Sequence, residues 1–391
     1  MNELRESTKA IYGHEFVDED LGVFIPPIYL TAVFEQRGST LTTDRGTDLK
    51  YSREENPTVR ALEKVLSKLE EGVDSLAFNS GMASISAVLL NFINKDLKVV
   101  ALMELYGSTL QLLQLLSNKV GFKLHLSWPE TSELIEDLKS FKPNLVFIES
   151  ITNPMLRVID VTEVAKICRD LGCKLVVDNT FATPLLLNPL SNGAILVVHS
   201  LTKYIAGHND VLGGALIAKD SALIQSLWDW RRLIGGIMQP LEAYLTLRGV
   251  KTLEVRFEKS SKTAMSIAEY LSDNTKVAEV HYPGLSNSPY KSIADRIFKK
   301  RLYGGVVTFK LRGGMSEAVK FLKSLKIIKP SPSLGGTESL ITYPIISASK
   351  NIPRDVREKL GITESTLRLS VGLEDQEDII EDIDQALASL S

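Results

Sequence analysis

Two short segments of the chain carry side chains suited to imine chemistry. The apolar run Ile195–Val198 stops at His199 and leads to Lys203, which follows two hydroxyls, and the run Leu175–Val177 stops at the carboxylate Asp178. A lysine amine can bind an aldehyde as an imine, and a carboxylate can keep a pyridine nitrogen protonated. Pyridoxal phosphate (PLP) acts as an electron sink only while its ring carries that positive charge. The two segments together therefore predict a PLP site.

Three further segments end apolar runs with polar or aromatic groups. Asn79-Ser80-Gly81-Met82 opens a helical pattern, so its backbone N–H groups can bind a phosphate. Tyr106 follows the next run, where its ring can stack on a flat cofactor, and Asn153 supplies an amide after another. Open α/β sheets bind ligands at the carboxyl ends of their strands. We therefore expect these groups to converge with Asp178 and Lys203.

The elements that must position these residues form an α/β pattern. Helical spacing of apolar residues is found in Ser84–Phe92, Thr109–Leu116 and Val161–Leu171, the last opened by Asp160 and Glu163 as in a capping box. The predicted strands are Ser75–Phe78, Lys98–Leu102, Lys123–Leu126, Leu145–Glu149, Lys174–Asp178, Ile195–His199 and Gly214–Ala218. Strands apolar on both faces and interleaved with helices predict a mostly parallel seven-stranded sheet covered on both sides.

The sequence after the predicted sheet contains fewer strand patterns and more helical ones. An amphipathic stretch runs over Gln239–Leu271, and strands are expected near Val306–Leu311 and Thr366–Val371 before a closing helix. We therefore predict three units: an N-terminal arm over residues 1–55, a cofactor-binding α/β domain over 56–250, and a smaller C-terminal α+β domain over 251–391.

Composition narrows the class of protein. The chain has 391 residues, 44% hydrophobic and 24% charged, with a net charge of −3. A balanced charge favours neither nucleic acid nor an anionic membrane as a partner. Cys168 and Cys173 are too few for a disulfide framework or a structural zinc site, and we expect them in the core, with no metal bound. No signal-peptide or transmembrane pattern is present, so we expect a cytoplasmic protein.

The segment Ser200-Leu201-Thr202-Lys203-Tyr204-Ile205-Ala206-Gly207-His208-Asn209-Asp210 resembles the PLP-attachment signature of the Cys/Met-metabolism family of PLP enzymes. This family includes cystathionine γ-synthase, cystathionine γ- and β-lyases, methionine γ-lyase and the O-acylhomoserine sulfhydrylases. The resemblance extends from Ile25-Pro26-Pro27-Ile28-Tyr29 to Leu367-Arg368-Leu369-Ser370-Val371-Gly372-Leu373-Glu374. It implies the aspartate-aminotransferase-like fold (fold type I) and PLP as the cofactor.

The resemblance also implies roles for single residues. Lys203 would carry the cofactor and shuttle protons, Asp178 would pair with the pyridinium nitrogen, and Tyr106 would stack on the ring and assist proton transfer. Further cofactor contacts are implied for Gly81, Met82, Ser200 and Thr202 at the phosphate, for Asn153 at the phenolic oxygen, and for Tyr51 and Arg53 at the phosphate of the neighbouring subunit. Substrate contacts are implied for Arg368, as a clamp on the α-carboxylate, and for Ser333, Asn153 and Tyr51.

Shared sites of this kind predict a homotetramer built as a dimer of dimers, with small amino acids as substrates. The expected reaction is γ-replacement on an O-activated L-homoserine with L-cysteine, as in a cystathionine γ-synthase. The alternatives are γ-elimination, as in cystathionine or methionine γ-lyases, and O-acylhomoserine sulfhydrylation. A non-catalytic PLP-binding paralogue is an alternative of another class. A nucleotide-binding domain is disfavoured, because the chain has no phosphate loop or dinucleotide fingerprint.

Ser347-Ala348-Ser349 stands where relatives carry a hydroxyl–histidine pair. Two other departures from the family pattern lie where the distal end of the substrate should be recognised. Ser108 stands where methionine γ-lyases carry a cysteine, and Ser108-Thr109-Leu110-Gln111 lacks the arginine of many cystathionine enzymes. Pro332 replaces a glutamate before Ser-Leu-Gly. Arg45, in the arm, is a candidate for the missing positive charge.

Overall fold

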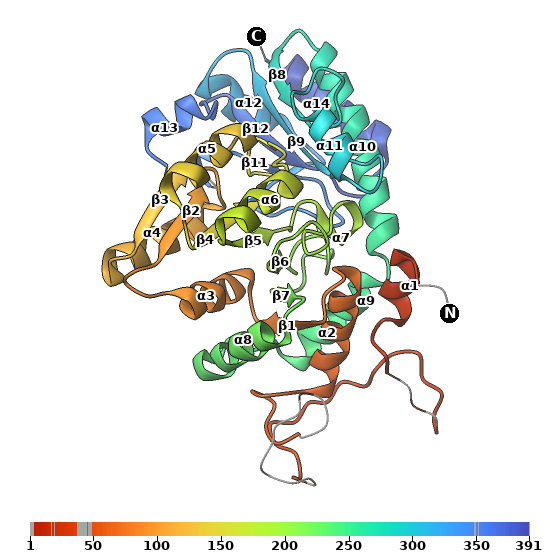
Figure 1. Ribbon diagram of the computed structural model, residues 1–391. Coiled ribbons are helices and arrows are strands. Elements are labelled where there is room, and N and C mark those ends of the chain that lie inside the picture. The colour runs from red at the N-terminus through yellow and green to blue at the C-terminus, as the bar shows by residue number, and fades with distance from the viewer. Residues whose placement is uncertain are drawn as a thin grey trace.

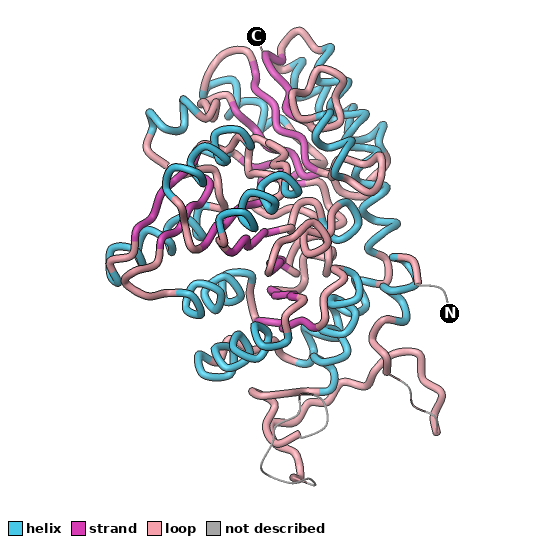
Figure 2. Tube along the Cα trace, viewed as in Figure 1, coloured by secondary structure: helices cyan, strands magenta, loops and turns pink. Residues whose placement is uncertain are grey.

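The computed structural model describes residues 4–16, 18, 20–36, 45, 49–347, 349–350 and 352–390. Its large sheet has seven strands in the order β1-β7-β6-β5-β4-β2-β3 (Figures 1 and 2). Strand β7 is antiparallel to both of its neighbours, and the other pairs are parallel. The strands are β1 (Asp74–Phe78), β2 (Lys98–Leu102), β3 (Lys123–Ser127), β4 (Leu145–Glu149), β5 (Lys174–Asp178), β6 (Leu196–Ser200) and β7 (Gly214–Ala218). The expected mostly parallel seven-stranded sheet is confirmed.

Helices connect these strands and pack on the sheet. The Asp160 carboxylate accepts a 3.1 Å bond from the Glu163 backbone N–H, so α6 begins where its N-cap predicts. The Asn56 side chain caps α2 in the same way, through the Thr58 N–H at 3.0 Å. The helices are α2 (Pro57–Leu69), α3 (Gly81–Phe92), α4 (Gly107–Val120), α5 (Thr131–Phe141), α6 (Val161–Leu171), α7 (Thr183–Leu186), α8 (Ser221–Ile234) and α9 (Pro240–Val250).

The amphipathic stretch over Gln239–Leu271 forms two helices rather than one. Helix α9 ends at Val250, and α10 (Leu253–Asp273) follows after two residues. Gly249, in the last turn of α9, lies against the backbone of Ala206, and an added Cβ would stand 2.1 Å from the Ala206 carbonyl oxygen. Only a residue without a side chain fits at this contact between α9 and the loop that carries Lys203.

A second sheet forms the C-terminal part in the order β10-β11-β12-β9-β8. Its elements are β8 (Val277–His281), α11 (Lys291–Ile297), β9 (Val306–Leu311), α12 (Met315–Ser324), β10 (Lys329–Pro330), β11 (Leu340–Thr342), the 3₁₀ turn Pro344–Ile346, α13 (Arg354–Lys359), β12 (Thr366–Ser370) and α14 (Gln376–Ala388). The two expected strands are confirmed. The other three escaped notice because β10 and β11 are very short and β8 is polar on much of its surface.

The two sheets have largely separate hydrophobic cores, one around β1–β7 and one formed by α10, α14 and the second sheet. Among the described residues, no helix is long and apolar enough to cross a membrane. The division of the chain at residue 250 stays a prediction, although α10, which packs on β8 and β9, begins at Leu253. Cys168 and Cys173 are both free and buried, as expected.

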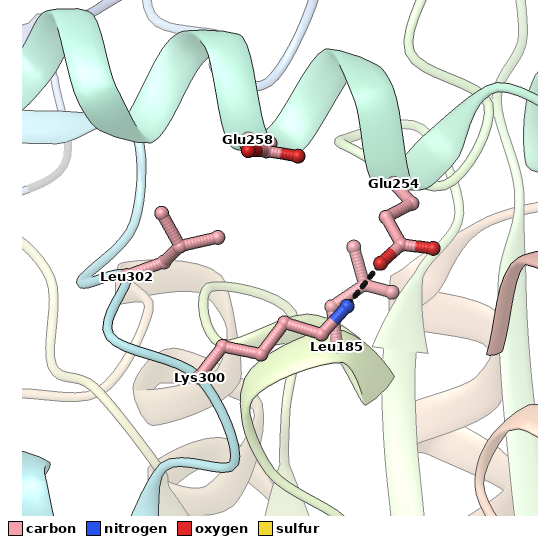
Figure 3. A pocket seen from close by; sticks show the side chains of 5 residues that line it. All are labelled: Leu185, Glu254, Glu258, Lys300 and Leu302. Carbon is pink, nitrogen blue, oxygen red and sulfur yellow. Dashed lines mark hydrogen bonds and ion pairs between the residues drawn. The ribbon is translucent and has the colours of Figure 1, made fainter. Parts of the chain in front are cut away.

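Helix α1 (Glu6–Tyr12) packs against α2 and α10, and the arm after it extends away from the body (Figure 1). Beside the start of α10, a cavity of about 260 Å³ is lined by Glu254, Glu258, Lys300 and two leucines (Figure 3). Lys300 forms an ion pair with Glu254, which also accepts a bond from the Ser7 hydroxyl. These polar contacts tie α1 to α10.

Candidate active site

A cavity of about 620 Å³ lies at the carboxyl ends of the parallel strands. Each of β2, β4, β5 and β6 leads into a lining segment, and α3 opens at the same edge. Ten of the residues singled out in the sequence line this cavity: Gly81, Met82, Tyr106, Asn153, Asp178, Ser200, Thr202, Lys203, Ser333 and Arg368. The structure thus brings together side chains from both parts of the chain, as a sheet-edge site requires.

Lys203 lies in the turn after β6, with its amine inside the cavity. Its Nζ donates to the Ser333 hydroxyl at 3.2 Å. Burial, together with the nearby Arg368 guanidinium, lowers the pKa of Lys203 to about 8. A substantial fraction of this amine is therefore neutral near physiological pH, as a nucleophile or base must be.

Asp178 ends β5 and is held by the residue two positions later. One carboxylate oxygen accepts bonds from the Thr180 backbone N–H at 3.0 Å and from the Thr180 hydroxyl at 2.6 Å. Burial raises the pKa of Asp178, and these two bonds oppose the rise. The arrangement presents an oriented carboxylate that a protonated ring nitrogen would stabilise.

The opening turn of α3 lies against the segment after β6. The Ser80 hydroxyl caps α3 by accepting a 3.1 Å bond from the Ala83 N–H. A Cβ on Gly81 would stand 3.2 Å from the Cβ of Ser200, and one on Gly214 would lie 2.3 Å from the Ser80 carbonyl oxygen. These close approaches place the free N–H groups of the first turn beside the Ser200 and Thr202 hydroxyls, which is a donor set suited to a phosphate.

Arg368, on β12, is a buried cation without a carboxylate partner among the described residues. It is 1% exposed, and its guanidinium donates to the Asn153 side-chain oxygen at 2.6 Å and to the Thr342 hydroxyl at 3.0 Å. Carbonyl oxygens of Pro332 and Ser333 accept further bonds, at 3.2 and 3.3 Å. Its Nε has no partner in that part of the chain, and burial lowers the pKa of Arg368 to about 10. A buried guanidinium with a free donor favours an anionic ligand.

Tyr106 also lines the cavity, in the segment between β2 and α4. It is 45% exposed and precedes the first turn of α4, and its backbone N–H donates to Glu149 at 2.6 Å. Glu149 also lines the cavity, although the sequence offered no reason to single it out beyond its position at the end of β4.

The two arm residues do not line the cavity of their own chain. Tyr51 is 42% exposed, and the Arg53 guanidinium lies 5.2 Å from the centre of its ring. Both belong to the arm that extends from the body (Figure 1). Their expected contact with a neighbouring subunit therefore stays a prediction.

The proposal of Arg45 as a distal substrate contact is wrong. Its side chain is 8% exposed and forms ion pairs with Glu55, Glu63 and Asp74 at 2.6–2.8 Å. A guanidinium already paired with three carboxylates has no donor to offer a substrate. Glu55 belongs to the same ion cluster, because its carboxylate also lies 3.4 Å from the Arg231 guanidinium. Together they anchor the end of the arm.

Two residues that escaped notice hold the lysine loop in place. The guanidinium of Arg256, on α10, donates to the carbonyl oxygens of Tyr204 and Gly249, at 2.9 and 2.8 Å. Gly335 adopts φ +76°, and a Cβ there would stand 2.6 Å from the Tyr204 nitrogen. Neither could be found from local patterns, because each lies more than fifty residues along the chain from the loop it contacts.

The cavity wall near the departures has uncharged side chains in the described part of the chain, but the Arg368 guanidinium lies against it and donates to the Pro332 carbonyl at 3.2 Å. Ser108, Pro332, Ile346 and Ser347 line it. Ala348, the middle residue of Ser347-Ala348-Ser349, lies outside the described residues. The distal end of a substrate would therefore meet small polar and apolar groups of its own subunit.

The donor set fits PLP. An anion-binding helix start, an oriented carboxylate and a lysine of lowered pKa surround one cavity, and the unpartnered Arg368 Nε adds a site for a substrate carboxylate. A flat, anionic aldehyde with a basic ring nitrogen satisfies the first three of these groups at once.

Comparison with known proteins agrees with this geometry. Residues 7–388 match the family model described as "Cys/Met metabolism PLP-dependent enzyme". The chain is 37% identical to a cystathionine γ-lyase of Bacillus subtilis over 99% of its own length and 100% of the relative. It is 35% identical to a cystathionine γ-synthase/O-acetylhomoserine (thiol)-lyase of the same organism, covering 95% of this chain and 94% of that protein.

The fold is similar to that of a solved cystathionine γ-synthase from Xanthomonas oryzae pv. oryzae, in complex with aminoacrylate and cysteine. The TM-score is 0.93 at 34% identity, over 99% of this chain and 98% of that one. The relatives are PLP-dependent lyases and synthases of sulfur amino-acid metabolism, so the non-catalytic alternative is not retained. The chain is an enzyme that belongs to the Cys/Met-metabolism family and uses pyridoxal 5′-phosphate as its cofactor.

Proposed function

We propose that this enzyme catalyses γ-replacement on an O-activated L-homoserine, with L-cysteine as the thiol and cystathionine as the product. The main support is the presence in one cavity of the low-pKa Lys203 and of Arg368, which is buried without a carboxylate partner in the described part of the chain. An amino-acid substrate supplies the carboxylate that the arginine lacks and presents its Cα to the lysine. The nearby relatives that act as synthases add support for replacement at Cγ.

In this proposal, each residue acts through a contact that its position allows. Arg368 binds the α-carboxylate, and Asn153 and Thr342 fix the guanidinium in plane. Lys203, as a neutral amine beside Ser333, would accept the proton from Cα, pass it to the bound cofactor, and so become free to accept the Cβ proton that γ chemistry requires. Tyr106 stacks on the cofactor ring and lies near enough to the cavity to assist proton transfer.

Other residues of the cavity would hold the phosphate and the ring nitrogen of the cofactor. Gly81 and Met82 would bind the phosphate with backbone N–H groups, Ser200 and Thr202 with hydroxyls, and Asp178 would keep the ring nitrogen protonated. When bound, the pyridinium ring supplies a sink for the negative charge that develops on the substrate.

Elimination at Cγ from a substrate with an apolar distal end, such as methionine, is a second candidate, supported by the uncharged side chains of the distal wall. Cystathionine carries an ammonium and a carboxylate at its distal end, and Ser108, Pro332 and Ser347 offer neither an acid nor a base to bind them. A small thiol such as sulfide, used in O-acylhomoserine sulfhydrylation, also suits that wall. These three reactions share every step up to the loss of the group on Cγ.

We further propose that Tyr51 and Arg53 complete the phosphate site of a neighbouring subunit in a homotetramer. Support comes from their distance from the cavity of their own chain and from the exposed apolar side chains of the arm, such as Phe24 and Leu30. Surfaces of this kind are normally buried against a partner. The proposed location of the tetramer is the cytoplasm.

The test is product analysis with O-acetyl-, O-succinyl- and O-phospho-L-homoserine, each with and without L-cysteine. Cystathionine that forms only with cysteine, at the expense of 2-oxobutanoate, would establish the replacement reaction. Equal release of 2-oxobutanoate with and without cysteine, and also from cystathionine, would show elimination instead. A Lys203→Ala variant serves as the blank, because it retains the phosphate contacts and lacks the amine.

A further inference from the structure

Glu149 is a second carboxyl group at the cofactor cavity, directly beside Asp178. The two residues are register partners on the adjacent parallel strands β4 and β5, so their side chains emerge on the same face of the sheet. Glu149 is 6% exposed and lines the same cavity. Two adjacent buried carboxylates repel each other, and one bound pyridinium cannot compensate both.

The hydrogen bonds of the two carboxyl groups differ. Asp178 accepts two bonds from Thr180, which stabilise its ionised form. Glu149 accepts a 2.6 Å bond from the Tyr106 N–H at Oε1, whereas its Oε2 is buried and has no partner in the described chain. An ionised carboxylate with one buried, unsatisfied oxygen is costly, and a protonated carboxyl is much less so.

The charged groups around Glu149 act in the same direction. Burial raises the pKa of Glu149 well above its usual range, and the carboxyl groups of Asp178 and then Glu104 raise it further. Backbone N–H groups of Tyr106 and Asn153 oppose the shift. The Arg157 guanidinium pairs with Glu104, at 2.9 Å, and not with Glu149.

The two cations that line the cavity are engaged elsewhere. Lys203 bonds to Ser333, and Arg368 bonds to Asn153. Neither forms an ion pair with Glu149 among the described residues. In the described part of the chain, Glu149 therefore has no ion-pair partner that would favour its ionised form.

We propose that Glu149 remains protonated in the working enzyme and acts as a positioning residue, which holds the Tyr106 backbone and leaves Asp178 as the single anion of the cofactor site. A neutral carboxyl keeps the hydrogen bond that orients the start of α4. An ionised Glu149 would compete with Asp178 for the proton of the ring nitrogen, and a neutral carboxyl avoids this competition. The inference rests on PLP as the cofactor and not on which of the candidate reactions the enzyme performs.

The test is the infrared absorption spectrum of the apoenzyme at several pH values from about 6 to 9, where an ordinary glutamate is fully ionised. Wild type and Glu149→Gln are compared at each pH, so that the band of Glu104, whose pKa burial raises to about 7, cancels. Wild-type protein should show the carbonyl band of a protonated carboxyl throughout, and Glu149→Gln should lack it. Glu258→Gln, at an exposed ion pair on α10, is the matched control and should leave the band unchanged. Absence of the band in wild-type protein at neutral pH would overturn the proposal.

The dissociation constant of PLP from the apoenzyme, followed by intrinsic fluorescence, gives a second readout that needs no turnover. Glutamine is isosteric with the protonated acid, so Glu149→Gln should change this constant by less than about 3-fold, whereas Asp178→Asn should raise it by about 100-fold or more. A loss of about 10-fold or more in Glu149→Gln would show that an anion had been removed and would contradict the proposal. If that variant does not fold, the wild-type band at pH 9, where a Glu104 carboxyl with a pKa of about 7 is ionised, decides the question alone.

Discussion

Arg368 donates a 2.6 Å hydrogen bond to the side-chain oxygen of Asn153, and 215 residues separate the two along the chain. The bond joins β12 of the small sheet to the segment after β4 of the large one. It ties the substrate clamp to the cofactor pocket. The relative position of the two sheets thereby sets the geometry of the site.

Replacement of Arg368 by lysine tests the clamp. Lysine keeps the charge but lacks the planar fork, so KM for amino-acid substrates should rise by about 10- to 100-fold. Steady-state kinetics on an O-acylhomoserine would measure the change. An analogue that lacks the α-carboxylate should be equally poor for both proteins. Unchanged KM in the variant would remove Arg368 from the substrate site.

Asn153→Asp tests whether the free charge of Arg368 matters. The new carboxylate would pair with the guanidinium and compete with the substrate, so KM should rise by about 10-fold or more above that of Asn153→Ala. The alanine variant is the matched control, because it removes the 2.6 Å bond without adding a charge. Equal KM values for the two variants would contradict the proposed role.

The lowered pKa of Lys203 predicts a pH-dependent stability of the apoenzyme. The folded protein binds this proton with a pKa of about 8, against the usual 10.5 in the unfolded chain. The unfolded chain therefore binds more protons between those values, and the free energy of unfolding rises with pH across this window. Lys203→Met should be more stable than wild type at pH 7, by a margin that shrinks as the pH approaches about 10.

Urea unfolding of both apoproteins at several pH values would measure this margin. Lys262→Met, at an exposed lysine of α10, is the control and should show no such trend. A constant difference between Lys203→Met and wild type would mean that the lysine is not perturbed.

The buried ion cluster around Glu63, at the base of the arm, should contribute strongly to the free energy of unfolding. Glu63 is fully buried and pairs with Arg45, Arg60 and Arg231 at 2.5–3.1 Å. Although burial alone would raise the pKa of Glu63, these guanidinium groups lower it to about 2. Glu63→Gln leaves three guanidinium groups with two carboxylates, those of Glu55 and Asp74, and should cost about 3–5 kcal/mol of unfolding free energy. Denaturant unfolding would measure this loss, and the control variant Glu258→Gln should lose less than about 0.5 kcal/mol of unfolding free energy.

The shared site predicts complementation between two inactive variants. Lys203→Ala lacks the lysine but keeps its arm, and Arg53→Ala keeps the lysine but lacks an arm contact. Co-refolded in equal amounts, the pair should recover about a quarter of the wild-type activity, because half of the dimers would each contain one intact site. Activity no higher than the mean of the separate variants would mean that Arg53 serves its own chain or none.

Much of the large sheet could be predicted because its signals are local. Strands such as Leu145–Glu149 are short apolar runs bounded by polar residues, and they match the observed elements within one residue. The capped start of α6 is equally local. The small sheet was harder, since β10 pairs through only two residues and owes its existence to β11 beside it. The contact of Gly249 in α9 with Ala206 could not be predicted, because the two residues lie outside any one sequence window.

The cofactor chemistry could be predicted from local patterns alone. These patterns are a lysine and a carboxylate at the ends of neighbouring strands and a glycine at a helix start, a combination with few other uses. Tertiary structure decided the electrostatics. Arg45 is consumed by a buried ion cluster, Arg368 is left without a counter-ion, and Glu149 stands beside Asp178 with one oxygen unpartnered. Charges interact through space with a strength set by burial and distance, and neither quantity can be read along the chain.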